Sequence, residues 1–209
     1  GASNREGVPG HVVMQNLLKA GFQGPLMPVN PKYQAVCGVL AYANVQALPM
    51  NPDLAILCTP PHTIPHLIQE LGERGVRAAI ILTAGMRREL SGSESATEWT
   101  GMLETARKFG MRLLGPNTIG LLIPSIHLNA SFAHLEALPG SLAFISQSGA
   151  LCTAVLDWAH SQGIGFSHFL SLGDSADIDV GDVLDYLGSD PNTSAILLYI
   201  ESITQARKS

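Results

Sequence analysis

The chain opens with glycines and a hydroxyl residue directly before a stretch of helical spacing. Ser3 ends a Gly-Ala-Ser run, and Gly7, Val8 and Gly10 follow it. Such a loop leaves backbone N–H groups at the start of a helix, where unpaired amides and the positive end of the helix dipole attract an anion. These residues predict a pyrophosphate-binding loop, with a plain tight connection as the alternative.

A lysine stands where a dinucleotide-binding domain places a carboxylate. Rossmann domains that bind NAD have Asp or Glu about 20 residues beyond the glycine-rich loop, where it accepts the ribose 2′-hydroxyl. Here the region reads Val-Asn-Pro-Lys and ends at Lys32. A cation suits a phosphorylated ribose, as in coenzyme A or NADP, and disfavours NAD. The alternative is a solvated surface lysine.

Small, polar or proline-rich residues follow three further apolar runs. The turns carry Pro60, then Thr83, Ala84 and Gly85, then Asn117. Ligands of open α/β sheets bind outside the carboxyl ends of the strands, where such turns allow close approach to the backbone. One turn of this kind is ordinary connection chemistry. Together with the turn before Lys32, the set predicts a binding crevice.

A Ser-Gln-Ser-Gly run from Ser146 to Gly149 joins an apolar strand candidate directly to a helix candidate. Two hydroxyls and free amides at a helix start make a phosphate cradle. A serine nucleophile elbow needs G-x-S-x-G, and Ser146 stands where its first glycine belongs. The remaining alternative is Ser148 as a simple N-cap.

The acidic and histidine clusters are better explained without a metal. Asp174, Asp177 and Asp179 precede a helix candidate, and Asp favours both turns and N-caps. His62 and His66 have helical spacing but lack the glutamate of an H-E-x-x-H site, which favours an exposed helix face. We therefore expect no metal site.

Glu201 ends an apolar strand candidate at the same sheet edge as the other turns. A carboxylate in that place can orient a partner group, with plain solvation as the alternative.

Composition limits the class of protein. The 209 residues are 46% hydrophobic and 14% charged, enough for a buried core in one large or two small α/β domains. A net charge of −5 without a basic run disfavours nucleic acid. No apolar run approaches the roughly 18 residues of a membrane span. Three widely spaced cysteines fit a reducing, cytoplasmic setting and a buried, unreactive role.

Short apolar runs alternate with amphipathic stretches, as in βα units that build a parallel sheet. The first series is expected to form helices over 11–22 and 63–74 and strands over 25–29, 53–59, 78–83 and 112–115. The second is expected to form strands over 141–146, 166–172 and 194–201 and helices over 150–162 and 180–187. The predicted division is a domain at 1–123 whose first strand precedes the chain, a linker at 124–140, and a domain at 141–209 cut in its middle.

The ordered set of motifs resembles the CoA-binding domain of NDP-forming acyl-CoA synthetases and of the succinyl-CoA ligase α subunit. The likeness lies in 1–13, 28–32, 53–55, 83–85 and 114–117. The runs at 146–149 and 173–174, with Glu201, are similar to the ligase domain that follows. The wording of 128–132, 156–159 and 173–179 is most similar to bacterial protein lysine acetyltransferases that fuse this module to a GNAT domain.

The resemblance implies an α/β fold, with a Rossmann-like CoA-binding domain followed by part of a flavodoxin-like ligase domain, both on parallel sheets. It implies that coenzyme A or acetyl-CoA contacts Ser3, Gly7, Val8, Gly10, Lys32, Pro60, Thr83, Ala84 and Gly85. It implies that phosphate is held by Asn117, Ser146, Gln147, Ser148 and Gly149.

In active ligases of this family a downstream histidine is phosphorylated, and Glu201 matches the glutamate that steadies it. None of the seven histidines lies beyond Glu201. The ATP-grasp domain or subunit that uses ATP or ADP with Mg is also outside this sequence, so the chain is expected to be catalytically incomplete.

Three parent proteins remain open. In an acetyltransferase with a GNAT domain and substrate proteins the histidine is often lost, and the module is thought to sense acyl-CoA. The others are a stand-alone ADP-forming acetyl-CoA synthetase and a CoA-binding regulatory module without catalysis, with an NADP-binding domain less favoured.

Overall fold

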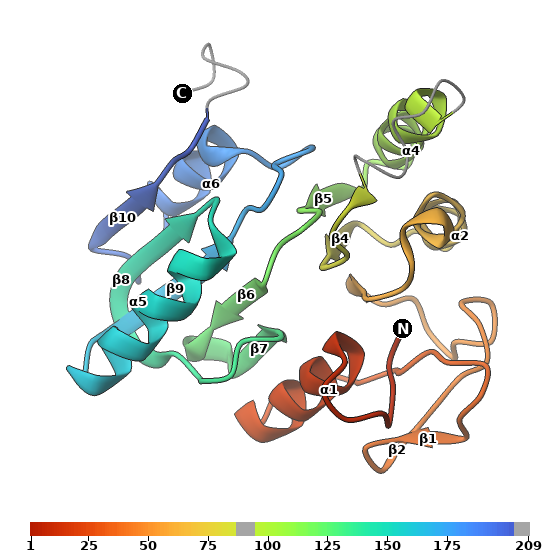
Figure 1. The fold of residues 1–209 in the computed structure, drawn as a ribbon, viewed down its shortest axis with the longest axis horizontal. Helices are drawn as coiled ribbons and strands as arrows, with labels where there is room; N and C mark the ends of the chain where they lie inside the picture. Colours follow the sequence, from red (N-terminus) through yellow and green to blue (C-terminus); the bar gives the residue numbers. More distant parts are fainter. Residues whose placement is uncertain (87–94, 203–209) are drawn as a thin grey trace.

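Two larger β-sheets lie side by side, each with helices packed on it, and β1 and β2 form a separate two-stranded sheet (Figure 1). The structure, a computed structural model, describes residues 1–86 and 95–202. The elements of the first half are α1 (Pro9–Ala20), β1 (Ala35–Val36), β2 (Val39–Leu40), β3 (Leu54–Leu57), η1 (Pro61–Thr63), α2 (Ile64–Glu73), β4 (Ala78–Ile81), α4 (Ser95–Lys108) and β5 (Arg112–Leu114). Those of the second half are β6 (Gly120–Ile123), η2 (Pro124–Ile126), β7 (Leu128–Ser131), β8 (Leu138–Ser146), α5 (Gly149–Ser161), β9 (Gly165–Ser171), α6 (Val180–Leu187) and β10 (Ala195–Tyr199).

The first sheet is parallel, in the order β3-β4-β5. Its strands are apolar on both faces because helices cover both, as expected for parallel strands. Ala79 and Ile81 of β4 face the core under α2 and α4. Ile80 and Leu82 face the opposite way, toward α1. Side chains alternate between the two faces along the strand, so α2 and α4 cover one face of the sheet and α1 covers the other (Figure 1).

The second sheet has the order β10-β8-β9-β6-β7. Strands β10, β8 and β9 are parallel, whereas β6 runs antiparallel to both β9 and β7. Phe144 of β8 packs with α5, and its neighbours Ala143 and Ile145 pack with α6. The expected α/β fold with parallel strands is confirmed, and an antiparallel hairpin is added to its second sheet.

The segment 25–29 is not the strand that its apolar residues predict. It forms one parallel bridge, between Val29 and Tyr42. Prolines at 25, 28 and 31 explain the difference, because each removes a donor that a strand ladder needs.

The segment 124–140 was expected to lack regular structure, yet it contains η2, β7 and the start of β8. The sequence pattern does not predict β7, because Asn129 and Ser131 are polar although they are buried. Their side chains bond each other at 2.6 Å, which makes their burial tolerable.

One apolar core joins the two sheets. It unites Val13 and Leu17 of α1 and Leu114 of β5 with Leu170 of β9 and Val183 of α6. The segment after β9 also bonds along the end of β5: the amides of Ala176 and Ile178 donate to Gly115 and Leu113 at 3.0 and 3.1 Å. These bonds hold the carboxyl end of β5, in the first sheet, close to the segment that follows β9 in the second sheet.

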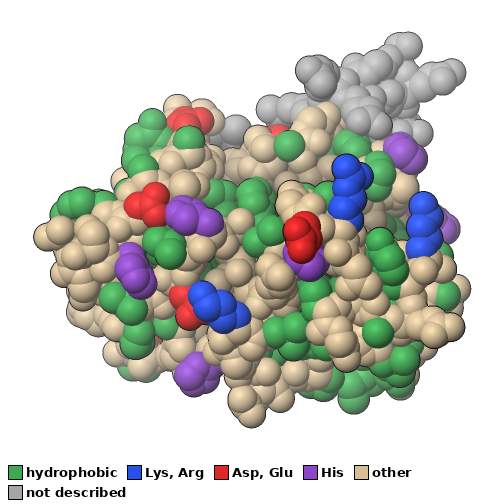
Figure 2. Space-filling view, turned by 60° about the horizontal axis from the view of Figure 1, so that its bottom comes forward, with side chains coloured by type: hydrophobic (Ala, Val, Ile, Leu, Met, Phe, Trp, Pro, Cys, Tyr) green, Lys and Arg blue, Asp and Glu red, His purple; other side chains and the backbone are tan. Residues whose placement is uncertain are grey.

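Charged side chains on the face shown in Figure 2 are scattered among neutral ones and form no basic patch. Within 1–86 and 95–202, none of the helices has the length and hydropathy needed to cross a membrane.

Candidate functional site

The opening loop lies against the start of α1. Val8 is the N-cap and makes no side-chain cap bond, while Pro9 at the first helical position has no N–H to satisfy. The amide of Gly10 is left without an acceptor inside the helix. A Cβ on Gly10 would lie 1.9 Å from the carbonyl oxygen of Gly1, so only glycine permits this contact. The geometry is that of an anion site at a helix N-terminus.

Two asparagines hold the neighbouring turns against this loop. Asn30 donates from Nδ2 to the carbonyl of Ala2 at 2.7 Å and accepts the amide of Lys32 at 2.8 Å. Asn4 donates to Ala35 at 2.8 Å, which attaches the β1–β2 hairpin. The side chain of Lys32 is exposed at this edge. Ser3 is held in the same loop, where its hydroxyl accepts the amide of Arg5 at 3.0 Å.

The carboxyl ends of the three strands of the first sheet are bonded to one another. Thr83, after β4, donates from Oγ1 to the carbonyl of Thr59, after β3, at 2.7 Å. The amide of Asn117, after β5, donates to Thr83 at 3.0 Å. Pro60 follows Thr59 at the start of η1, and Ala84 and Gly85 are exposed beside them. The structure thus brings the predicted turn residues together at one edge.

The turn from β8 into α5 is built by its own hydroxyls. Ser146 is fully buried, and its Oγ accepts the amide of Ser148 and donates to the carbonyl of Ser148, both at 3.0 Å. Ser148 is the N-cap of α5 and accepts the amide of Leu151 at 3.3 Å. The amides of Gly149 and Ala150, at the first two helical positions, have no acceptor in the helix. An anion at this turn therefore meets backbone amides. The buried hydroxyl of Ser146 holds the backbone of the turn in place through its two bonds to Ser148.

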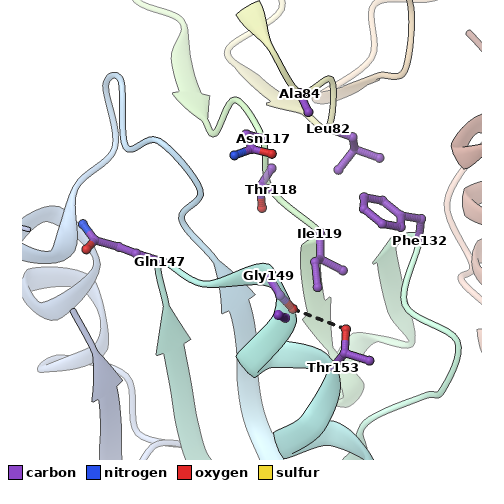
Figure 3. Close-up of a pocket in the computed structure, with 10 residues that line it drawn as sticks. Leu82, Ala84, Asn117, Thr118, Ile119, Phe132, Gln147, Gly149 and Thr153 are labelled. Atoms are coloured by element: carbon purple, nitrogen blue, oxygen red, sulfur yellow. Dashed lines mark hydrogen bonds between the residues drawn. The ribbon is translucent and has the colours of Figure 1, made fainter. Parts of the chain in front are cut away.

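The side chain of Gln147 is directed away from these amides, toward the end of β10 (Figure 3). Its Oε1 accepts the amides of Glu201 and Ser202 at 2.7 and 3.0 Å, and its Nε2 donates to the carbonyl of Ser202 at 2.9 Å. Its own amide donates to Tyr199 at 3.1 Å. Gln147 therefore ties the segment that carries the exposed Glu201 to the turn between β8 and α5.

A pocket of about 380 Å³ lies where the two halves meet, between the edge of the first sheet and the start of α5 (Figure 3). It is lined by Leu82, Ala84, Asn117, Thr118, Ile119, Phe132, Gln147, Gly149, Ala150 and Thr153. Ala84, Asn117, Gln147 and Gly149 are residues singled out from the sequence. The others were missed, because single apolar, threonine or alanine residues from separate segments carry no motif.

The acidic residues after β9 act structurally. Asp179 N-caps α6 in a capping box with Asp182, as predicted. Asp177 accepts the amide of Leu113 at 2.8 Å and pairs with Arg112 at 3.0 Å. Asp174 accepts from the side chain of Asn117 at 3.1 Å, which links this segment to the site.

Two cysteines near the site are poor nucleophiles at neutral pH. Desolvation by burial raises the pKa of Cys58 and of Cys152 to about 11, so both remain thiols. Burial also raises the pKa of Cys37. These shifts favour the unreactive role predicted for them.

We expect Ser148→Ala to cost about 1 kcal/mol of stability through loss of the N-cap. Phosphate binding should weaken only modestly, because the backbone amides remain. Urea unfolding and phosphate titration by calorimetry measure the two effects. Covalent labelling of Ser148 by a fluorophosphonate, with ester hydrolysis lost in Ser148→Ala, would instead establish a nucleophile.

Comparison with known families decides the relationship. Residues 1–124 match the family described as CoA binding domain, and residues 139–209 match the succinyl-CoA ligase like flavodoxin domain. The chain belongs to the NDP-forming acyl-CoA synthetase α-subunit-like family. The α-subunit-like order of the two domains agrees with the resemblance seen in the motifs.

Similar proteins of this family are CoA ligases. The chain is 39% identical over 208 residues to acetate–CoA ligase (ADP-forming) I of Archaeoglobus fulgidus, covering 100% of the chain and 30% of the relative. It is 39% identical over 212 residues to the α subunit of acetate–CoA ligase (ADP-forming) I of Pyrococcus furiosus, covering 100% and 46%. The chain therefore spans less than half the length of these relatives.

A solved structure has the same fold over the whole chain. It is the acetyl-coenzyme A synthetase 1 of Candidatus Korarchaeum cryptofilum, described as a complex with phosphate and ADP. The TM-score is 0.92 at 35% identity, and the match covers 99% of this chain and 44% of that one. None of these three relatives is named as a GNAT-fused acetyltransferase.

Proposed function

We propose that this chain is the CoA-binding and phosphate-handling α portion of an ADP-forming acyl-CoA ligase. The observation that carries the proposal is that the predicted CoA edge and the predicted phosphate turn open onto one pocket, which Ala84 and Gly149 line together. A CoA thioester and a phosphate must approach each other in such an enzyme, and this arrangement allows it.

In the proposed reaction, acyl-CoA, ADP and phosphate give a carboxylic acid, CoA and ATP. Phosphate displaces CoA from the thioester to form an acyl phosphate, whose phosphoryl group passes to a histidine and then to ADP. The backbone amides at Gly149 and Ala150 hold the phosphate, and Glu201 orients the histidine. The histidine and the ATP-grasp partner that binds the nucleotide with Mg belong to the complete enzyme.

The similarities favour the stand-alone ligase over a GNAT-fused acetyltransferase, since the relatives compared are named as CoA ligases. ATP formation from acetyl-CoA, ADP and phosphate by the complete enzyme tests this choice. Acetylation of protein lysines without ATP formation would favour the acetyltransferase instead.

CoA binding tests the proposal directly. Calorimetry on the protein should show CoA or acetyl-CoA bound more tightly than NAD, because Lys32 replaces the carboxylate that NAD needs. Tighter binding of NAD would contradict the assignment.

We expect Lys32→Ala to weaken CoA more than dephospho-CoA, because the proposal assigns this lysine to the ribose 3′-phosphate. The loss of one charge-assisted contact should cost about 1.5 to 3 kcal/mol, roughly a ten- to hundredfold change in Kd. Lys19→Ala, a surface lysine that pairs with Glu136, is the matched control. Equal losses for the two ligands would place the Lys32 side chain elsewhere.

A further inference from the structure

The pocket between the two halves has an apolar wall that the proposed phosphate chemistry does not use. Leu82, Ile119 and Phe132 turn toward the same space from three separate segments (Figure 3). The first turns of α5 face them through Gly149 and Ala150. This wall lies next to the place where a CoA thioester would meet the phosphate turn.

We propose that this pocket is the subsite for the acyl group, and that Phe132 determines the length of the acyl chain it accepts. The proposal rests on the proposed function, because it places the thioester end of acyl-CoA at this pocket. The ligand class is an uncharged aliphatic acyl chain.

The polarity of the lining supports this ligand class. None of the described residues that line the pocket carries a charge. Thr118 is buried and uses its hydroxyl on the carbonyl of Ser171 and the amide of Gly120. Thr153 donates its hydroxyl to the carbonyl of Gly149. Against the wall formed by Leu82, Ile119 and Phe132, a charged tail would lose its hydration without gaining a partner, whereas an aliphatic tail gains from burial.

The backbone around Phe132 is held on several sides. Asn16 of α1 donates from Nδ2 to the carbonyls of Ser131 and Ala133 at 2.9 and 2.8 Å, one on each side of Phe132. The amide of Phe132 itself donates to Ile119 at 3.1 Å. A ring on so constrained a backbone forms a fixed wall, and a fixed wall discriminates between chains that differ by a few methylenes.

The test measures Kd for CoA and for acetyl-, butyryl-, hexanoyl- and octanoyl-CoA by calorimetry. In Phe132→Ala we expect the octanoyl-to-acetyl affinity ratio to rise at least about tenfold over the unmodified protein, because space is added along the chain. In Ala150→Leu, which keeps a good helix former at a lining position, the ratio should fall instead.

Leu128→Ala is the matched control. Leu128 lies on β7, the strand that Phe132 directly follows, and packs partly buried in the core that Phe132 also borders, but it does not line the pocket. The octanoyl-to-acetyl affinity ratio of Leu128→Ala should equal that of the unmodified protein.

Unchanged ratios in both Phe132→Ala and Ala150→Leu, with CoA still bound, would overturn the subsite and leave the proposed function standing. Failure of the unmodified protein to bind CoA would overturn the proposed function, and the subsite with it. If Phe132→Ala does not fold, Phe132→Leu and Ala150→Leu decide: ratios that move in opposite directions support the subsite, and ratios that do not move overturn it.

Discussion

Gly10→Ala should abolish tight CoA binding. The added Cβ would lie 1.9 Å from the carbonyl oxygen of Gly1 and 2.9 Å from its carbon, and both are backbone atoms. The opening loop must then move away from the start of α1, which removes the free amide of Gly10 from the proposed pyrophosphate site. Loss of a charge-assisted hydrogen bond there costs about 1.5 to 3 kcal/mol, a weakening of roughly ten- to hundredfold. Calorimetric titration with CoA measures it.

The control for this change is Gly101→Ala. Gly101 lies within α4, and a Cβ there meets nothing within 4 Å, so CoA affinity should be unchanged. The stability of this variant should rise by up to about 1 kcal/mol, since alanine favours a helix over glycine. CoA affinity within twofold of the unmodified protein in a folded Gly10→Ala variant would show that the ligand does not use this loop.

Much of the fold could be predicted from the sequence because its signals are local. The helix at 180–187 was predicted to the residue, since Asp179 caps its start and an apolar face follows. The prediction of a strand over 25–29 was wrong, because it gave more weight to the apolar residues of the segment than to its prolines. Strand β7 was missed for a different reason: Asn129 and Ser131 are polar, and their burial breaks the apolar pattern by which a buried strand is recognised. Their side chains satisfy each other within the strand, and Ser131 also accepts the amide of Ala133.

Part of the candidate site could likewise be predicted from the sequence, and part could not. The turns after β3, β4 and β5 were predicted because parallel strands place their carboxyl ends at one edge, and the bonds among Thr59, Thr83 and Asn117 confirm that they meet. The apolar wall at Phe132 could not be predicted, since it depends on how the hairpin β6–β7 packs against α1. The link between Gln147 and Glu201 spans 54 residues of sequence and has no motif.

Gln147→Ala should lower the turnover of the complete enzyme. Without its three bonds to the backbone of Glu201 and Ser202, the segment after β10 loses its attachment to the phosphate turn. If Glu201 orients the phosphorylated histidine, as proposed, a shift of about 1 Å can cost about 10²-fold in rate. The KM for CoA should hardly change, because the proposed CoA edge lies on the other sheet.

Gln147→Glu gives a graded test of the same geometry. It keeps an oxygen that can accept the amides of Glu201 and Ser202, but it loses the donor to Ser202 and adds a charge near Glu201. Its turnover should fall between those of the unmodified enzyme and Gln147→Ala.

Ser194→Ala is the matched control, because Ser194 also joins β10 to β8, through Ser141 at 2.8 Å, but at the opposite end of the strands. It removes a side-chain bond between the same two strands without touching the segment of Glu201. Its turnover should stay near that of the unmodified enzyme. Equal losses in Ser194→Ala and Gln147→Ala would mean that Gln147 serves only the pairing of β10 with β8. A loss confined to Gln147→Ala, with unchanged CoA binding, would place Gln147 in the positioning of Glu201, since only that end of the strand reaches the phosphate turn.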